Sequence, residues 1–376
     1  MKKSVLMIAA SEHDADMLYA SGIFVPDPFI AARIGSRWHG LFSPLEVDRA
    51  RRHCKLDEIH LDTVWKERAQ ANGWGKGLAA TAAAFLKAHG ISEILVPGHF
   101  SLRHAEQLGS WGFRVKAAEE SLFRERITKN ETEIGYLARA ERLTRKAMQS
   151  AETFLAESRM GSDGILLHPE VAGKVKSKHL RSVIETFLIR HGAMPAHTIV
   201  ACGTESADPH HIGHGYLRAH QPIIIDIFPR LIATGYWGDM TRTYLKGKAP
   251  ERIKKLYNTV KEGQKIGLGM VGDSVSGEAI HRAITAWFDK QGFKTGMLRG
   301  RQSGFFHGTG HGVGLEIHEA PRISVGGDIL KTGHVITIEP GLYYPGLGGV
   351  RLEDMVVVRP DGHTNLTKHP CKLEIP

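Results

Sequence analysis

The first third of the chain alternates between helical and strand patterns. Residues 79–90 read AATAAAFLKAHG, an alanine-rich helix that Gly90 is suited to end. Residues 91–119 then read as strand, helix and strand, starting from the short apolar run in SEILVPG. VLMIAA, at residues 5–10, follows two lysines as in a signal peptide, but the run is short and the polar SEHDAD comes next, so a first strand is expected. We therefore expect a small α/β domain over residues 1–122.

The rest of the chain places helices before strands, twice. A long helix is predicted for residues 130–157, where apolar residues recur at near-helical spacing and Asn130 can cap the helix with Glu133. Further elements are helices at 168–192, 250–263 and 275–291, and two strand pairs, 221–230 with 234–245 and 334–344 with 348–358. Residues 123–376 are therefore predicted to be an α+β domain, in which helices flank an antiparallel sheet. The repeated order suggests an internal duplication, although no clear sequence repeat accompanies it.

Composition adds little to this picture but excludes several classes of protein. The 376 residues are 42% apolar and 24% charged, which is ordinary for a globular protein. Cys54, Cys202 and Cys371 are scattered, so neither a disulfide framework nor a cysteine zinc site is expected, and a reducing compartment fits. The net charge is +9, but the basic residues are dispersed and form no nucleic-acid-binding module, so no nucleic acid is expected as a partner. No stretch approaches the roughly 20 apolar residues that span a bilayer, so we expect no membrane partner and a cytoplasmic location.

Four acids stand where the predicted strands call for apolar residues. Asp226 follows PIII, Asp239 follows GYWG, Glu339 interrupts VITIEPGLY, and Glu353 interrupts VRLEDMVVV. Any one of them could face solvent, but an unpaired buried carboxylate costs several kcal/mol or more. Few lysines lie beside these acids, so bound metal is the simplest shared counter-charge for all four.

Three histidines lie close together in FFHGTGHGVGLEIHEAP, residues 305–321. His311 stands between glycines, which let the backbone approach closely, and it is the expected metal ligand. His307 and His318 can line the same cavity as proton carriers or oxyanion donors, or can be structural imidazoles. Four carboxylates and one imidazole carry a charge of −4, which two divalent ions would neutralise. This oxygen-rich set suits Mn, Co or Fe(II) as well as Zn.

These segments together resemble a known family. DIFPRLIATGYWGDMTRT, HGTGHGVGLEIHEAPR, TIEPGLYYPGLGG and VRLED are similar to the motifs of the pita-bread metallopeptidases, family M24. That group includes methionine aminopeptidase, aminopeptidase P, prolidase and creatinase. The resemblance covers roughly residues 123–376, and DADMLYASGIFVPDPF is similar to the N-terminal domain of prolidases. It implies a pita-bread catalytic domain at 123–376, preceded by a creatinase/prolidase-like α/β domain at 1–122.

The resemblance also implies a role for each metal ligand. Asp226 would be a terminal ligand of one ion, Asp239 and Glu353 would bridge, and His311 and Glu339 would bind the other ion. The implied nucleophile is a hydroxide that bridges two divalent metals, with Glu339 moving its proton. Manganese is the expected metal, with cobalt, zinc or iron as alternatives.

Other residues match the family's substrate-binding positions. His210 and His318 would hold the substrate and stabilise the tetrahedral intermediate, and His307 would lie near the proline end of the substrate. Arg351 would support the site. Arg322, four residues after His318, resembles the prolidase arginine that captures the free carboxylate of a dipeptide.

The sequence departs from the family pattern at two places. Ile227 and Phe228 follow Asp226 where a glycine is usual at the second position, and the segment between Asp226 and Asp239 is slightly longer than in most members. Loop shape, rather than metal binding, is therefore in question. His211 and His214 also crowd the expected His210, and the sequence does not separate their roles.

The resulting functional hypothesis is an Xaa-Pro dipeptidase. The alternative is aminopeptidase P, which releases the N-terminal residue from longer Xaa-Pro peptides. Creatinase-like hydrolysis and a non-catalytic binding module are more remote, since all five ligands are kept, and methionine aminopeptidase lacks the N-terminal domain. The family resemblance further implies a homodimer that acts on proline-containing peptides.

Overall fold

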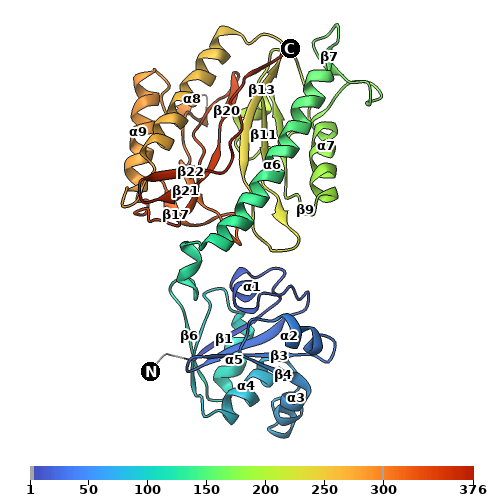
Figure 1. Cartoon of the computed structure of the whole chain (residues 1–376), viewed down its shortest axis with the longest axis vertical. Coiled ribbons are helices and arrows are strands. Elements are labelled where there is room, and N and C mark those ends of the chain that lie inside the picture. Colours follow the sequence, from blue (N-terminus) through green and yellow to red (C-terminus); the bar gives the residue numbers. More distant parts are fainter. Residues whose placement is uncertain (1–3, 299) are drawn as a thin grey trace. The chain divides into compact units, whose positions relative to one another are not determined.

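The computed structural model describes residues 4–298 and 300–376. By its internal contacts the chain divides into two compact units, the first ending at Arg126 and the second beginning at Ile127. Figure 1 shows both units. The predicted domain boundary at residue 122 stays a prediction.

The first unit is a mixed six-stranded sheet in the order β4-β3-β2-β1-β5-β6. Its strands are β1 (Val5–Ala9), β2 (Phe29–Ile34), β3 (Arg37–Phe42), β4 (Glu58–Leu61), β5 (Glu93–Val96) and β6 (Arg114–Ala117). Its helices are α1 (Ala15–Ser21), α2 (Val47–His53), α3 (Asp62–Ala71), α4 (Leu78–Ala88) and α5 (Leu102–Ser110). Strands β1 to β3 pair antiparallel, whereas β4, β5 and β6 join in parallel. This mixture is the predicted α/β class.

Helix α4 lies close to the sheet because its buried side chains are mostly alanine. Phe85 and Leu86 supply its larger contacts, in one core with Leu6, Ile30 and Leu41 of the sheet. The helix ends as predicted, since Gly90 adopts φ +70°, a left-handed conformation that glycine accepts without steric cost.

Four helices dominate the second unit: α6 (Glu131–Glu157), α7 (Ser177–Arg190), α8 (Glu251–Met270) and α9 (Gly277–Lys290). The predicted cap of α6 is confirmed, because the Asn130 side chain accepts from the Glu133 N–H at 3.0 Å and the Glu133 side chain accepts from the Asn130 N–H. The predicted start of α7 at residue 168 is wrong. Gly173 adopts φ +90°, which is not a helical conformation, and Lys174 and Lys176 form β-bridges, so the helix begins only at Ser177. Helix α8 runs beyond the predicted residue 263, and Gly267 there packs against Ile284 of α9.

The strands of the second unit form two main sheets and several two-stranded ribbons. The first sheet holds β10 (Ile199–Cys202), β11 (Ile223–Ile227), β13 (Met240–Lys246) and β23 (Glu374–Ile375). The second sheet holds β17 (Glu319–Ile323), β16 (Gly310–Gly312), β18 (Val335–Ile338), β21 (Asp354–Arg359) and β22 (Gly362–Asn365). The ribbons are β7 (Arg159–Met160) with β8 (Leu166–Leu167), β9 (Ala193–Met194) with β12 (Arg230–Leu231), β14 (Gly296–Leu298) with β15 (Arg301–Ser303), and β19 (Gly341–Tyr344) with β20 (Gly348–Arg351).

Each main sheet is covered by its own pair of helices. Helices α6 and α7 share one apolar core with β10, β11 and β13, and helices α8 and α9 share another with β18, β20 and β21. Figure 1 shows the strands between these two helix pairs. The predicted class, a largely antiparallel sheet flanked by helices, is therefore confirmed.

The second predicted strand pair, 334–344 with 348–358, is wrong in detail. Each predicted strand is split in two, at Glu339–Pro340 and at Leu352–Glu353. Strands β19 and β20 form an inner hairpin, and β18 pairs with β21 outside it, with Ile338 opposite Asp354 as the last pair. Pro340 has no N–H to donate to a ladder, which is one physical reason for the first break.

Two exclusions made from composition can be compared with the structure. Cys54, Cys202 and Cys371 are all free thiols. None of the helices in the described part of the chain has the length and apolarity that crossing a bilayer requires.

Candidate metal centre

The four predicted acids are placed by the ends of two antiparallel strand pairs. The ladder between β11 and β13 ends with Ile227 opposite Met240. Asp226 is therefore in the last pair but one, opposite Thr241, and Asp239 lies just outside the ladder. Strands β18 and β21 close in the same way, and Glu339 and Glu353 directly follow and precede the last pair. The two pairs are tied together, since the Glu353 N–H donates to the Thr241 carbonyl at 3.0 Å.

Three of the predicted ligands form a compact group. Ligand atoms of Asp239, His311 and Glu353 all lie within 4.8 Å of one another. His311 Nε2 is 3.6 Å from Asp239 Oδ2 and 3.4 Å from Glu339 Oε1, so the fourth predicted ligand borders the same space. Asp226 differs, because its Oδ2 accepts a hydrogen bond from Arg351 Nη2 at 2.7 Å.

Glycines hold the His311 strand in place, as a close approach of backbones requires. A Cβ at Gly310 would lie 1.9 Å from the Thr337 carbonyl oxygen, and one at Gly312 would lie 2.1 Å from the Ala320 carbonyl oxygen. Strand β16 therefore fits between its neighbours only without side chains on either side of His311. These glycines were expected to let the backbone approach the metal. In the structure they allow the strand that carries the ligand to pack closely between its neighbours.

The electrostatics of this space match a site for cations. Burial, and then repulsion from the other acids, holds the pKa values of Asp239 and Glu353 well above their usual range. Burial raises the pKa of Glu339 to about 8, against the opposing effect of Arg351. Burial and then His318 lower the pKa of His311 to about 4, so this imidazole is neutral and has a lone pair to donate. Clustered carboxylates with one neutral imidazole are a donor set that fits divalent metal ions.

Arg351 connects the acids to a hydrogen-bonded chain on one side of the site. Its guanidinium donates to Asp226, to the Tyr343 hydroxyl at 2.9 Å and to the Pro209 carbonyl at 3.2 Å. The Tyr343 oxygen lies 3.0 Å from His307 Nε2, and His307 Nδ1 lies 2.7 Å from the Gly308 carbonyl. A carbonyl only accepts, so the Nδ1 of His307 carries the proton and its Nε2 accepts from Tyr343. Both ring nitrogens of His307 are therefore engaged within the protein.

The remaining predicted histidines lie at the border of this space. The His318 ring meets the His311 ring edge-on, with 4.4 Å between their centroids. Burial and then His210 lower the pKa of His318, and His210 also contributes to the lowered pKa of His307, so His210 lies near both. His211 and His214 instead contact one another at 5.6 Å. The charge of His210 therefore acts on two of the predicted site histidines, which agrees with its expected place at the site.

Arg322 is opposite His311 in the β16–β17 ladder and is exposed. Its backbone N–H donates to Asp328 Oδ2 at 2.7 Å. Within residues 4–298 and 300–376, its guanidinium has no hydrogen bond or ion pair. It nevertheless adds to the lowering of the pKa of His311 and of His318, so a cation without a partner stands near the site.

Several residues that position the site escaped the sequence analysis. Tyr343 links Arg351 to His307, and Thr241 Oγ1 donates to Glu353 Oε2 at 2.8 Å. Glu141 of α6 accepts from the Asp239 N–H at 3.0 Å and from the Thr367 hydroxyl at 2.6 Å, and burial raises its pKa to about 7. Tyr343 and Thr241 lie inside the quoted motifs, whereas nothing near Glu141 in the sequence signals its role.

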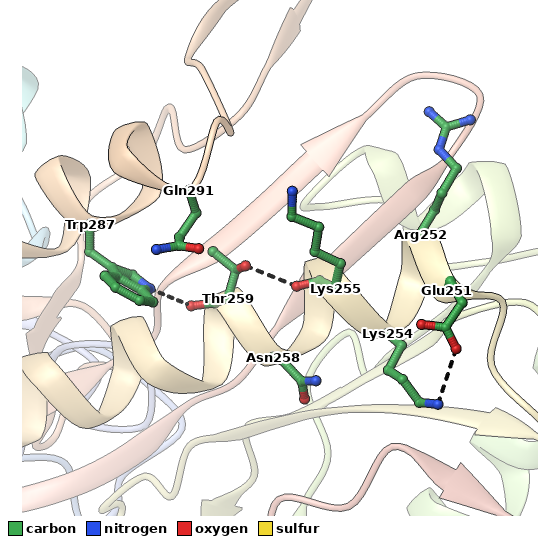
Figure 2. A pocket seen from close by; sticks show the side chains of 8 residues that line it. All are labelled: Glu251, Arg252, Lys254, Lys255, Asn258, Thr259, Trp287 and Gln291. Carbon is green, nitrogen blue, oxygen red and sulfur yellow. Dashed lines mark hydrogen bonds and ion pairs between the residues drawn. The ribbon is translucent and has the colours of Figure 1, made fainter.

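A separate hollow of about 600 Å³ lies over α8 and α9 (Figure 2). Lys254, Lys255 and Trp287 line it, and the Trp287 indole N–H donates to the Thr259 carbonyl at 3.0 Å. It contains none of the predicted site residues and is open to solvent, so it has no part in the metal centre.

Comparison with known proteins agrees with the geometry. The sequence model of metallopeptidase family M24 matches residues 135–360. The Xaa-Pro dipeptidase of Pyrococcus furiosus is 34% identical over 252 residues, which are 66% of this chain and 65% of that protein, slightly less than two thirds of its length.

Solved structures share the whole fold. The prolidase of Pyrococcus horikoshii superposes with a TM-score of 0.80 at 25% identity, covering 99% of this chain and 95% of that one. The X-Pro aminopeptidase of Thermotoga maritima superposes with a TM-score of 0.82, covering 100% and 97%, but at 21% identity it supports the fold alone. The predicted pita-bread fold with a preceding α/β unit is therefore confirmed.

Proposed function

The chain belongs to metallopeptidase family M24, and from this premise we propose that it hydrolyses Xaa-Pro bonds, chiefly in dipeptides. The observation that carries the proposal is the meeting of Asp239 and Glu353, which directly precede β13 and β21, with His311 in the middle of β16 and Glu339 beside them. The names of the relatives from Pyrococcus furiosus and Pyrococcus horikoshii support the substrate class.

We propose that two divalent ions, manganese in the native protein, bind the five predicted ligands. The set is Asp226, Asp239, His311, Glu339 and Glu353. Cobalt, zinc and iron(II) suit the same donors. When bound, such ions lower the pKa of a water molecule towards neutrality and polarise the scissile carbonyl. Arg351 would hold Asp226 in position, and Glu339 would receive the proton of the attacking water at its carboxylate oxygen.

The substrate would be held from the histidine side of the site. His210 and His318 would donate to the oxyanion that develops on the scissile carbonyl. His307 has both ring nitrogens occupied, so it would contact the proline ring through its edge while Tyr343 fixes its tautomer. The lowered pKa values of His307 and His318 agree with neutral imidazoles at these two positions.

Arg322 favours a dipeptidase over aminopeptidase P. A dipeptide ends one residue past the scissile bond, so its carboxylate enters the site and needs a cation. The exposed guanidinium of Arg322 offers a planar, two-donor fork for that group. A longer peptide presents a neutral amide at the same place and gains nothing from Arg322.

The test compares two substrates and two variants. The parent should hydrolyse Ala-Pro faster than Ala-Pro-Ala. Arg322→Ala should lose about 1.5–3 kcal/mol on the dipeptide, a roughly ten- to a hundredfold fall in kcat/KM. Arg190→Ala, at the exposed end of α7, removes the same charge elsewhere and should change neither rate. Faster cleavage of Ala-Pro-Ala, unaffected by Arg322→Ala, would instead establish aminopeptidase P activity.

We also propose the wider organisation expected from the family. Residues 1–122 would form the N-terminal domain and residues 123–376 the catalytic domain, since none of the proposed catalytic residues precedes His210. The chain would form a cytoplasmic homodimer through its N-terminal domain. A monomer at micromolar concentration in light scattering would exclude the dimer.

A further inference from the structure

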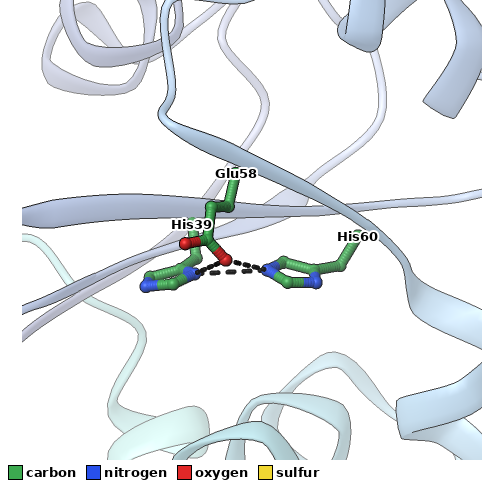
Figure 3. Close-up of side chains that lie close together, drawn as sticks. All are labelled: His39, Glu58 and His60. Atoms are coloured by element: carbon green, nitrogen blue, oxygen red, sulfur yellow. Dashed lines mark hydrogen bonds and ion pairs between the residues drawn. The ribbon is translucent and has the colours of Figure 1, made fainter.

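Three metal-ligating side chains converge in the first unit, which supplies no residue to the proposed catalytic centre. They are His39 on β3 and Glu58 and His60 on β4, the edge strand of the sheet. The two strands pair in parallel, with His39 opposite Glu58 and Leu41 opposite His60. Alternate residues of a strand share a face, so the register brings all three side chains to one side of the sheet. Figure 3 shows them pointing towards one another.

The distances between their polar atoms have the size of a metal coordination shell. His39 Nδ1 is 3.2 Å from His60 Nε2 and 3.4 Å from Glu58 Oε2, and the last two atoms are 3.7 Å apart. Ligands at zinc bond lengths of about 2.0–2.1 Å, placed at the corners of a tetrahedron, are separated by about 3.3–3.4 Å. One ion could therefore contact all three atoms with little movement of the side chains.

Hydrogen bonding alone accounts for the cluster less well. One shared proton can join His39 to His60 at 3.2 Å, but the two distances to Glu58 exceed the 2.7–3.2 Å range of a good N–H···O bond. Glu58 is also already oriented, because its other oxygen, Oε1, accepts from Arg37 Nη1 at 2.6 Å. An outer partner that fixes a ligating carboxylate in this way is typical of metal sites.

The surroundings leave the site with one covered and one open side. The Phe85 ring lies 5.4 Å from both imidazoles, and Trp65 lies 6.4 Å from His60, so aromatic side chains of α3 and α4 cover the inner side. The His39 side chain is 8% exposed, whereas those of His60 and Glu58 are 26% and 35% exposed. An ion thus has a path of entry and room for a water molecule as its fourth ligand, as in other zinc sites with three protein ligands.

We propose that His39, Glu58 and His60 bind one zinc-class divalent ion, distinct from the ions of the catalytic centre. Two imidazoles and one carboxylate are a ligand set that zinc accepts in proteins. The ion would fasten the four-residue edge strand β4 to β3, and its binding would stabilise the folded first unit by mass action. The inference does not depend on the proposed peptidase function.

Zinc content of the full-length protein tests the proposal directly. The protein is dialysed against buffers of defined free zinc concentration, and bound zinc per chain is measured by mass spectrometry of the metal. His60→Gln should bind one ion fewer than the parent at low free zinc, with an affinity at that site at least ten- to a hundredfold weaker. His53→Gln removes an exposed imidazole at the end of α2 and should bind as the parent does.

Two further variants keep the outcome clear. If His60→Gln fails to fold by circular dichroism, Glu58→Gln, a milder change on the exposed side, takes its place. Glu353→Ala, altered in the catalytic centre, should retain the ion that depends on His60. Identical zinc content and affinity in the parent, His60→Gln and Glu58→Gln would overturn the proposal, whatever happens to peptide hydrolysis.

Discussion

Replacing Arg351 by methionine should destabilise the protein far more without metal than with it. Arg351 is 3% exposed, and its guanidinium donates to Asp226, Tyr343 and Pro209. Methionine keeps an apolar chain of similar length but leaves the Asp226 carboxylate without its 2.7 Å partner. Removing one member of a buried ion pair costs about 3–5 kcal/mol.

The metal state decides how much of that cost appears. In the metal-free protein nothing replaces the lost charge, so the full cost should be seen. At about 2–4 °C per kcal/mol for a unit of this size, the melting temperature should fall by roughly 6–20 °C. In the manganese-loaded protein the proposed ions would supply positive charge to Asp226, so the fall should be markedly smaller. Calorimetry of the full chain, with chelator and with excess manganese, measures both values.

Arg242 provides a matched control. It is fully buried and donates to Asp354 Oδ1 at 2.7 Å and to the carbonyls of Thr241, Glu353 and His369. Asp354 is not a proposed ligand, and the contact with Glu353 is to its backbone, not to its carboxylate. Arg242→Met should therefore lower the melting temperature about equally in both metal states. If Arg351→Met also gives equal shifts, Asp226 does not share its charge with a metal, and the role assigned to it is wrong.

Two other predictions concern stability. Burial, and then Lys129, lowers the pKa of His334 from 6.5 to about 4. Between these pH values the unfolded chain therefore binds a proton that the folded chain does not bind. The stability that this difference provides above pH 6.5 is lost as the pH falls towards 4. Between pH 7 and pH 5, the urea midpoint of His334→Asn should therefore fall less than that of the parent. An equal fall in both proteins would contradict this prediction. Asn130→Ala removes the cap of α6, which should cost about 1 kcal/mol and lower the melting temperature of the second unit by about 2–4 °C. An unchanged melting curve would show that the cap contributes nothing.

The sequence indicated the acids of the proposed metal centre for a local reason. Asp226 and Glu339 interrupt apolar runs that only a buried strand explains, so each is visible within a few residues. Tyr343 and Glu141 could not be found in this way, since their importance depends on Arg351 and Asp239, which they meet only after folding. A single sequence can therefore indicate ligand residues from their immediate neighbours, but it does not indicate the residues of distant segments that position them.

The same limit applies to the strands and to the first unit. The broken strands at Glu339 and Leu352 were predicted as continuous because apolar residues lie on both sides of each break. His39 and His60 stand 21 residues apart and form no motif. Only the parallel register of β3 and β4 makes them neighbours.

The placement of the acids at the ends of the two strand pairs has a consequence for how such enzymes diversify. The ladders that fix the acids end at Ile227 with Met240 and at Ile338 with Asp354, before the chain leaves each sheet. The turn at residues 232–234 is mostly exposed and stands apart from Asp226 and Asp239 in the sequence, so its length can change without moving either acid. The segment between Asp226 and Asp239, which is expected to be slightly longer than in most family members, would be one such change. The proposed substrate preference and metal binding are therefore separately variable parts of this architecture, and a loop library confined to residues 232–234 should change the first while leaving the second intact.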